Sequence, residues 1–484
     1  MVCQLTATEL SDKLRNKEVS ASEALDECLA RIRKLDPDYG AFLHVSEEDA
    51  RAEAANAQRL LDAGSGGPLT GVPLAVKDNM CTRGLPTTCA SKILEGFVPP
   101  YDATAVAQAR AAGLVVVGKT NLDEFAMGTS TENSAYFPTR NPWNPDLSPG
   151  GSSGGSAVAV ASEMVPLSLG SDTGGSIRQP AALCGVVGFK PTYGRVSRYG
   201  LVAFGSSLDQ IGPFARTVED AALLASVLSG HDPLDSTSLQ DSQISTAGLK
   251  GGSLKGMKIA VPKEFFSDAI QEGVREALDS ALEALKKEGA RVTEVSLPSI
   301  KLGVTTYYII APAEASSNLA RFDGVRYGPR VEEGEDHIEM VSATRGRLFG
   351  HEVKLRIMVG TYALSAGYYD AYYHRAQQVR GLMAAEFEQA YKEHDIVLGP
   401  TSPCTAFPLG DEELDQMALK LMDYCTIPAN MGGFPSLSLP CGYADGLPVG
   451  MLLNGPVNGD ERLLQAAYAI EQALPDARRR APMP

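Results

Sequence analysis

The sequence has no excess of basic residues. Its 484 residues include 43 lysines and arginines against 59 acidic residues, which gives a formal net charge of -16 at pH 7. Because proteins hold nucleic acid mainly through lysine and arginine contacts to phosphate, this surface is not expected to bind RNA by itself. If RNA is involved, a partner should supply the basic face.

Long apolar runs and a leader sequence are also missing. No apolar stretch approaches the roughly 20 residues that a helix needs to cross a bilayer. Residues 1–15 carry Glu9 and Asp12 and lack the apolar centre of a secretory signal. We therefore expect no membrane association, and a location in the bacterial cytoplasm, or in an organelle matrix or stroma if the chain is a mature organellar protein.

The eight cysteines are widely scattered and include no C-x-x-C pair. Such pairs are typical of zinc sites and redox-active disulfides, and dense cysteines are typical of small secreted scaffolds. The pattern predicts reduced, mostly buried thiols and no metal site.

What the sequence does contain is an alternation of helical and strand-like segments, which favours one large α/β domain. Capping boxes predict helix starts at Thr6 and Ser20. Residues 1–65 are predicted to be helices packed on the core, and residues 66–484 the core itself. Within that core, the polar stretch at about 232–255 is predicted to be a surface excursion, so that all segments form one domain.

A βαβ-like unit occupies the first part of the core. An apolar strand at 71–79 contains Lys77 near its end, and a helix at 102–113 and a buried strand at 114–117 follow. Because α/β sheets commonly place functional groups at strand ends, Lys77 is a candidate functional residue. Further helices are predicted at 47–63, 217–229, 268–288, 305–320, 351–392 and 460–474, and further strands at 257–261, 291–295, 396–398, 436–439 and 449–453. The strands at 257–261 and 291–295 form a second βαβ-like unit with the helix at 268–288.

Two loops rich in glycine and serine lie close together in the sequence. They are SPGGSSGGS at 148–156 and GSDTGGS at 170–176, separated by a predicted helix start and a buried strand at 165–169. Glycine-rich loops reach φ > 0 and leave backbone N-H groups open to a ligand. Hydroxyls set among such amides suggest acyl chemistry.

Other interpretations of the first loop compete with this one. A flexible linker would explain the composition, but a predicted helix and a second loop of the same kind follow at once. A phosphate-binding P-loop is excluded, because no Gly-Lys-Ser/Thr follows the glycines.

A third competitor is the nucleophile elbow G-x-S-x-G of serine hydrolases, which the loop matches at Ser152 and at Ser153. An elbow needs a strand before it, which two prolines disfavour here, and a histidine base after it. No downstream histidine lies in a segment that looks like a catalytic loop, although a remote one could fold into place, so the elbow stays open. The downstream histidines are His231, His337, His351, His374 and His394.

A neutral lysine can replace histidine as the base, because burial lowers the pKa of an amine. Lys77 follows an apolar strand and is a better candidate than lysines in polar runs such as 286–287. On this ground alone, however, a solvated or ion-paired lysine would be the simpler interpretation.

Three motifs together resemble the amidase signature family. They are LAVKD at 74–78, the first glycine-serine loop, and GSDTGGSIRQPA at 170–181, and the resemblance covers nearly the whole chain in the family's order and spacing. It implies a single α/β domain with a large mixed central sheet covered by helices on both faces.

The same resemblance implies the catalytic residues. Ser176 corresponds to the nucleophile, Ser152 to a bridging serine after a cis peptide bond, and Lys77 to the base. Backbone N-H groups that form an oxyanion hole correspond to Thr173, Gly174, Gly175 and Ser176.

Two further segments, 315–328 and 367–373, resemble the branch of this family that supplies ammonia to tRNA-dependent amidotransferases. In that branch an arginine and an aspartate hold free glutamine, and the matching residues here are Arg356 and Asp423. Their charges complement the carboxylate and the ammonium group of an amino acid. Without the resemblance, each would be interpreted as part of a surface ion pair.

This branch resemblance implies a glutaminase that supplies ammonia for converting Glu-tRNA(Gln) to Gln-tRNA(Gln), Asp-tRNA(Asn) to Asn-tRNA(Asn), or both. It implies a heterotrimer with B and C subunits, in which the B subunit contacts tRNA and uses ATP and Mg2+, so that no cofactor is expected in this chain. Two alternatives remain, a stand-alone amidase of the same family acting on a small amide and a non-catalytic scaffold.

Overall fold

The framework of the protein is one mixed sheet. The computed structural model describes residues 2–267, 269–334, 336–410 and 416–482. Within them, 11 strands pair in the order β1-β3-β2-β4-β6-β5-β10-β11-β9-β7-β8. The strands are β1 (Phe42–Val45), β2 (Pro73–Lys77), β3 (Val115–Thr120), β4 (Leu167–Asp172), β5 (Val187–Lys190), β6 (Gln210–Ala215), β7 (Lys258–Pro262), β8 (Arg291–Val295), β9 (Ile396–Pro400), β10 (Ser436–Ala444) and β11 (Leu447–Asn454).

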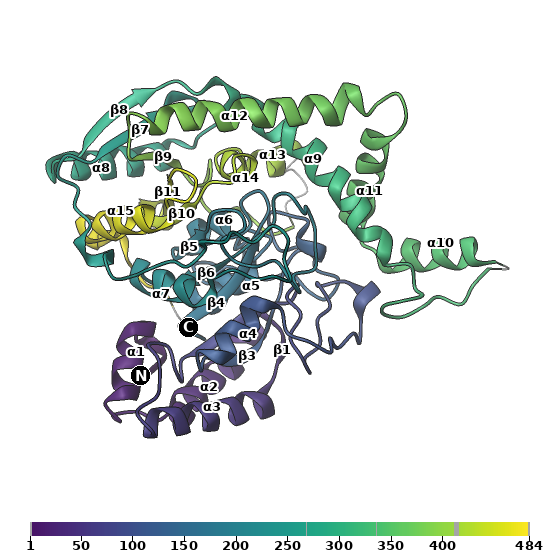
Figure 1. Cartoon of the computed structure of the whole chain (residues 1–484), viewed down its shortest axis with the longest axis horizontal. Helices are drawn as coiled ribbons and strands as arrows, with labels where there is room; N and C mark the ends of the chain where they lie inside the picture. The colour runs from purple at the N-terminus through teal and green to yellow at the C-terminus, as the bar shows by residue number, and fades with distance from the viewer. Residues whose placement is uncertain (1, 268, 335, 411–415, 483–484) are drawn as a thin grey trace.

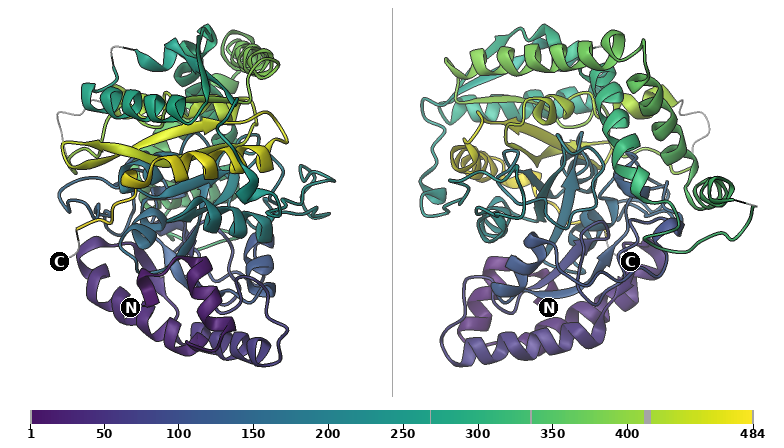
Figure 2. Two further views of the ribbon diagram at one scale, coloured as in Figure 1. Left: turned by 90° about the vertical axis from the view of Figure 1, so that its left-hand side faces the viewer. Right: turned by 45° about the vertical axis from the view of Figure 1, so that its right-hand side comes forward.

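Helices cover both faces of this sheet, with the N-terminal helices at one end and α12 near the other (Figures 1 and 2). The α-helices are α1 (Ala7–Arg15), α2 (Ala21–Tyr39), α3 (Glu47–Asp62), α4 (Thr104–Ala111), α5 (Gly154–Ala161), α6 (Arg178–Cys184), α7 (Val218–Leu228), α8 (Glu272–Lys287), α9 (Gly303–Asn318), α10 (His337–Leu348), α11 (His351–Leu364), α12 (Arg375–Tyr391), α13 (Gln416–Leu421), α14 (Ile427–Met431) and α15 (Asp460–Ala473). Short helical turns are η1 (Val2–Gln4), η2 (Lys92–Leu94), η3 (Glu124–Ala126), η4 (Leu249–Gly251), η5 (Lys263–Phe266), η6 (Pro298–Leu302), η7 (Leu319–Arg321), η8 (Asp370–His374) and η9 (Pro475–Ala477).

Both predicted βαβ units are confirmed. β2 and β3 are parallel neighbours on either side of α4 in the chain, with Val76 opposite Lys119. β7 and β8 are likewise parallel around α8. The parallel pair β2 and β4 places the C-terminal ends of two strands at one edge of the sheet.

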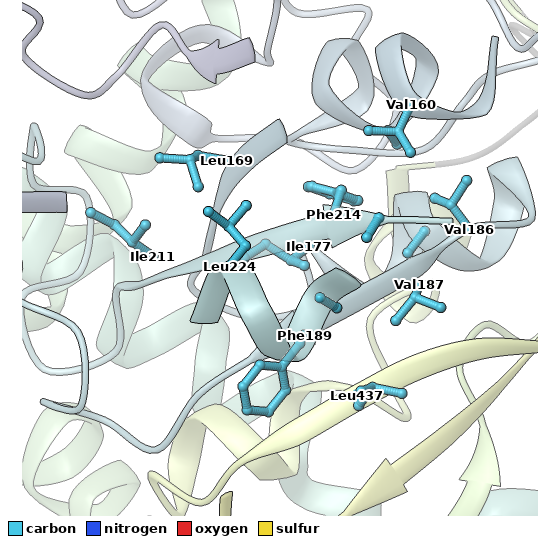
Figure 3. Packing of buried hydrophobic residues seen from close by; sticks show 14 of the residues in the cluster. Val160, Leu169, Ile177, Val186, Val187, Phe189, Ile211, Phe214, Leu224 and Leu437 are labelled. Atoms are coloured by element: carbon cyan, nitrogen blue, oxygen red, sulfur yellow. The ribbon is translucent and has the colours of Figure 1, made fainter. Parts of the chain in front are cut away.

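The hydrophobic core is continuous along the sheet and includes the apolar faces of α1, α2 and α3. Burial on both sides explains why β2 reads as a nearly uninterrupted apolar segment. Figure 3 shows the central part of this packing, from Leu169 of β4 through Phe214 of β6 and Phe189 of β5 to Leu437 of β10.

The single helix predicted at 351–392 is wrong. α11 ends at Leu364, and the chain then turns at Gly367, whose φ of 86° lies in the left-handed region that favours glycine. The π-helical turn η8 leads into α12. Helical periodicity continues on both sides of this turn, so the pattern of apolar residues hides it.

The structure also shows where the cysteines lie and how apolar the helices are. Seven of the eight cysteines are buried, and Cys404 is half-buried, as predicted for most of them. None of the helices in the described ranges is both long and apolar enough to cross a membrane. Nor do the described residues gather three His, Cys, Asp or Glu side chains that could hold a metal ion.

Candidate active site

The predicted catalytic residues come together at one edge of the sheet. Lys77 is the last residue of β2, and Ser176 lies in the loop that follows the parallel neighbour β4. Ser152 lies just before α5, and the N-H of the adjoining Ser153 donates to the backbone oxygen of Ser176 at 3.2 Å. The sheet topology thus joins residues that are 99 positions apart in the sequence.

Lys77 is completely buried among hydroxyl groups. Its Nζ lies 2.8 Å from Ser152 Oγ, 2.7 Å from Ser153 Oγ and 3.0 Å from Ser171 Oγ. Burial lowers the pKa of Lys77 to about 7, although Asp123 and Asp172 oppose the shift. A substantial fraction of this amine is therefore neutral near pH 7 and available to accept a proton from a hydroxyl.

Glycine at position 151 lets the Ser152 loop lie against Asp123. The peptide bond between Gly151 and Ser152 is cis. A Cβ at Gly151 would stand 2.2 Å from Asp123 Oδ2, so no other residue fits without a shift. The N-H of Asp123 in turn donates to the Ser152 backbone oxygen at 3.2 Å.

Ser176 is the most exposed of the hydroxyl-bearing residues in the second loop. It is 6% exposed, against 2% for Ser171 and 1% for Thr173, and Ser152 and Ser153 of the first loop are 0% exposed. Gly174 and Gly175 leave no room for side chains, because a Cβ would lie 2.8 Å from the Tyr307 ring at the first and 2.3 Å from Thr426 Oγ1 at the second. The Thr426 hydroxyl donates to the Gly174 oxygen at 2.7 Å and fixes the orientation of that peptide.

A buried ion pair holds this loop in place. Arg178 Nη2 lies 2.9 Å from Asp172 Oδ1, and its Nη1 donates to the Thr426 oxygen at 2.8 Å. Burial alone would raise the pKa of Asp172, but Arg178, with help from Lys190 and Asn430, outweighs it and the pKa falls to about 2. Asn430 adds a 2.8 Å hydrogen bond to the same carboxylate.

Sequence reasoning did not single out Arg178, Thr426 or Asn430 for this role. Arg178 stands in the motif GGSIR, two residues after Ser176, and a charge so close to a buried loop was the available signal. Thr426 and Asn430 lie about 250 residues away, and no local pattern marks them.

Arg356 and Asp423 are both buried, so interpreting them as members of surface ion pairs is wrong. Arg356 projects from α11, where its Nε donates to Glu352 at 2.7 Å and its guanidinium faces the Phe204 and Tyr308 rings at 5.5 and 5.2 Å. This end of the site therefore carries a fixed positive charge on an aromatic wall.

Asp423 lies against the loop that contains Ser176. A Cβ at Gly175 would be 2.8 Å from Asp423 Oδ1, and this buried oxygen has no hydrogen-bond partner among the described residues. Burial raises the pKa of Asp423 to about 7, and the nearby Asp172 adds to the shift. A buried, unpaired carboxylate beside a reactive loop suits a ligand that brings a positive charge.

The elbow interpretation finds no support in this arrangement. No strand precedes Ser152, because η3 is the only regular element between β3 and α5 in this fully described stretch. His231 and His374 pair with the glutamines Gln240 and Gln378, and no hydrogen bond joins any described histidine to the two serine loops.

An α/β fold with a buried lysine among the serines of two glycine-rich loops defines a class of amide-cleaving enzymes, and comparison with known proteins agrees. A family model described as Amidase matches residues 23–464. The chain belongs to the amidase family.

Individual members of that family are similar to this chain over nearly its whole length. The A subunit of the glutamyl-tRNA(Gln) amidotransferase of Desulforamulus reducens is 53% identical over 470 residues, which cover 97% of each chain. The crystal structure of the Thermotoga maritima protein of the same name has a TM-score of 0.82 at 45% identity and covers 100% of this chain and 98% of that one. The peptide amidase of Stenotrophomonas maltophilia has a TM-score of 0.83 at 31% identity, with 99% of each chain covered.

Proposed function

We propose that the chain is the glutaminase subunit of a glutamyl-tRNA(Gln) amidotransferase. The observation that carries the proposal is a pair of buried residues of opposite charge: Asp423 lies against the Ser176 loop, and Arg356 is near enough to lower the pKa of Asp423. Free glutamine presents the complementary carboxylate and ammonium groups, whereas a small neutral amide would leave, among the described residues, the Asp423 oxygen without a partner and Arg356 with Glu352 as its one ion-pair partner. The identity to proteins named as amidotransferase subunits supports the same assignment.

In the proposed reaction, neutral Lys77 takes a proton from Ser152, which takes one from Ser176. Ser176 Oγ then attacks the carbonyl carbon of the glutamine side chain. The proton returns to the leaving nitrogen, ammonia departs, and water cleaves the glutamyl ester to give glutamate and free Ser176.

The negative oxygen that forms during attack needs hydrogen-bond donors. Backbone N-H groups of Thr173, Gly174, Gly175 and Ser176 are proposed to supply them. Because Tyr307 and Thr426 hold this loop by direct contact, the donors are oriented before the substrate arrives.

The ammonia would be consumed on a partner. We infer a heterotrimer with B and C subunits, in which the B subunit binds ATP, Mg2+ and the misacylated tRNA, in the cytoplasm or an organelle matrix. A net charge of -16 fits a chain that leaves the tRNA to its partner. The names of the relatives favour Glu-tRNA(Gln) as acceptor, and Asp-tRNA(Asn) remains a second proposed acceptor.

A stand-alone amidase is the alternative, since the peptide amidase of S. maltophilia shares the fold. Substitution of Arg356 separates the two. Arg356→Gln should raise KM for glutamine roughly 10- to 100-fold, because hydrogen bonds to charged groups contribute about 1.5–3 kcal/mol. The effect on a small neutral amide should be far smaller.

The matched control is Arg195→Gln, which removes another buried, ion-paired arginine, 3.2 Å from Asp460 and on a different segment. It should leave the ratio of the two activities unchanged. Two results would contradict the proposed function. Arg356→Gln could lose activity equally on both substrates, or the wild-type chain could hydrolyse simple amides but not glutamine.

A further inference from the structure

Glu124 is a buried carboxylate to which the proposed reaction assigns no role. It begins η3, just after β3, and is 1% exposed. One oxygen accepts a hydrogen bond from the Ser91 hydroxyl, and the other accepts from the backbone N-H of Gly350 at 2.8 Å. A carboxylate is costly to bury unless it is hydrogen-bonded, and here each of its two oxygens has a partner.

Gly350 is the N-cap of α11, the residue just before its first helical residue. Its backbone is extended, with φ of -68° and ψ of 172°, and it has no side chain with which to cap the helix. The first N-H groups of a helix lack partners within the helix and carry partial positive charge. Glu124 therefore acts as the cap of α11, although it comes from an element more than 200 residues earlier.

The contact also explains glycine at position 350. A Cβ there would lie 2.3 Å from Glu124 Oε2, so any other residue would push the carboxylate and the helix start apart. Arg356 follows in the second turn of the same helix.

The segment that contains Glu124 also touches the catalytic loop. The N-H of the preceding Asp123 donates to the backbone oxygen of Ser152. The ring of the following Phe125 packs against Phe349, just before α11, at 5.7 Å between centroids. Three successive residues thus connect the relay serine to the start of the helix that carries Arg356.

Resting on the proposed function, we propose that Glu124 is a positioning residue that fixes α11, and with it the Arg356 guanidinium, relative to the catalytic serines. Glu352 cannot do this, because it lies on α11 and moves with Arg356. A carboxylate bound by a guanidinium requires defined geometry, so a shift of the helix would weaken binding of the substrate carboxylate more than it slows the chemistry.

The test compares Glu124→Gln with Glu471→Gln in the full chain, purified together with any partner chains that bind it. Glu471 is a matched control: it is also buried, and it accepts the N-H of Val218 at the start of α7 at 3.0 Å. Burial raises the pKa of both carboxyls to about 7. Assays at about pH 8 therefore keep both ionised in the wild type.

Glu124→Gln should raise KM for glutamine on the order of tenfold and change kcat, and kcat/KM for a small neutral amide, by less than about twofold. Gly350→Ala should act in the same direction, and it provides the same test if Glu124→Gln does not fold. In an Arg356→Gln background, Glu124→Gln should have no further effect on KM, because both act through one guanidinium. Glu471→Gln should leave the KM for glutamine unchanged.

Three results would overturn the inference. Glu124→Gln could affect both substrates equally, it could keep its full effect on KM in the Arg356→Gln background, or Glu471→Gln could change KM by the same factor. In each of these cases the proposed function would still hold if Arg356→Gln alone raised the KM for glutamine without a similar effect on the neutral amide. If Arg356→Gln itself shows no selective effect on glutamine, the proposed function falls and the role of Glu124 falls with it.

Discussion

Lys77 shows how one residue obtains its chemistry from its position. A lysine in water is charged at pH 7, but this one ends a strand whose residues are all buried, and its neighbours are hydroxyls rather than carboxylates. Asp123 and Asp172 favour the charged form from farther away, and burial outweighs them. The balance leaves an amine whose pKa of about 7 suits the proposed role of a base at neutral pH.

This balance predicts the direction of the pH dependence. Because the pKa of Lys77 is lowered to about 7, the neutral base accumulates as pH rises, and kcat/KM for a small neutral amide should rise through pH 7 and then level off. For glutamine the rise should be steeper, because the pKa of Asp423 is raised to about 7 and its ionised form is needed for the ammonium group. Initial rates from about pH 5.5 to 9 provide the measurement, and rates that fall with pH would refute Lys77 as the base.

At the scale of elements, the nucleophile loop owes its shape to contacts with distant helices. Tyr307 of α9 packs against Gly174, and Thr426, just before α14, packs against Gly175. At the other end of the loop, Arg178 pairs with Asp172 and donates a hydrogen bond to the backbone oxygen of Thr426. The N-H groups proposed to bind the oxyanion are therefore placed by tertiary packing, and not by the loop sequence alone.

Gly175→Ala should for this reason lower kcat on the order of 100-fold for glutamine and for neutral amides alike, which is the size of effect expected when one oxyanion donor is displaced. The added Cβ would meet Thr426 Oγ1 at 2.3 Å and Asp423 Oδ1 at 2.8 Å. Gly381→Ala is the control, because a Cβ there meets nothing within 4 Å on α12. An unchanged kcat in Gly175→Ala would show that the loop tolerates displacement.

Elements with strong local signals were predictable, and those defined by distant contacts were not. The apolar strand ending on Lys77 and the two βαβ units followed from composition and periodicity, and the structure confirms them. The break between α11 and α12 was missed, because the turn at Gly367 lies between two helical patterns. The contacts of Glu124 with Gly350, and of Arg178 with Thr426, span more than 200 residues and leave no local signature.

At the scale of the whole molecule, the mixed sheet is what brings the candidate site together. Lys77 ends one of its central parallel strands, the Ser176 loop follows another, and the Ser152 loop precedes α5. Arg356 comes from a helix of the second half, and Asp423 from the segment before α14. The class of fold could be predicted because three motifs resembled one family. Their meeting point in space depends on strand order, which the sequence alone does not display.

The central claim is that Ser176, and not a serine of the first loop, forms the covalent bond. The direct measurement is to mix the full chain with glutamine, quench with acid during the first turnover, and map the glutamyl ester by peptide mass spectrometry. The account predicts the ester on Ser176 and none in a Ser176→Ala protein, which should also lose glutaminase activity. An ester on Ser152, on Ser153 or on a cysteine would contradict it.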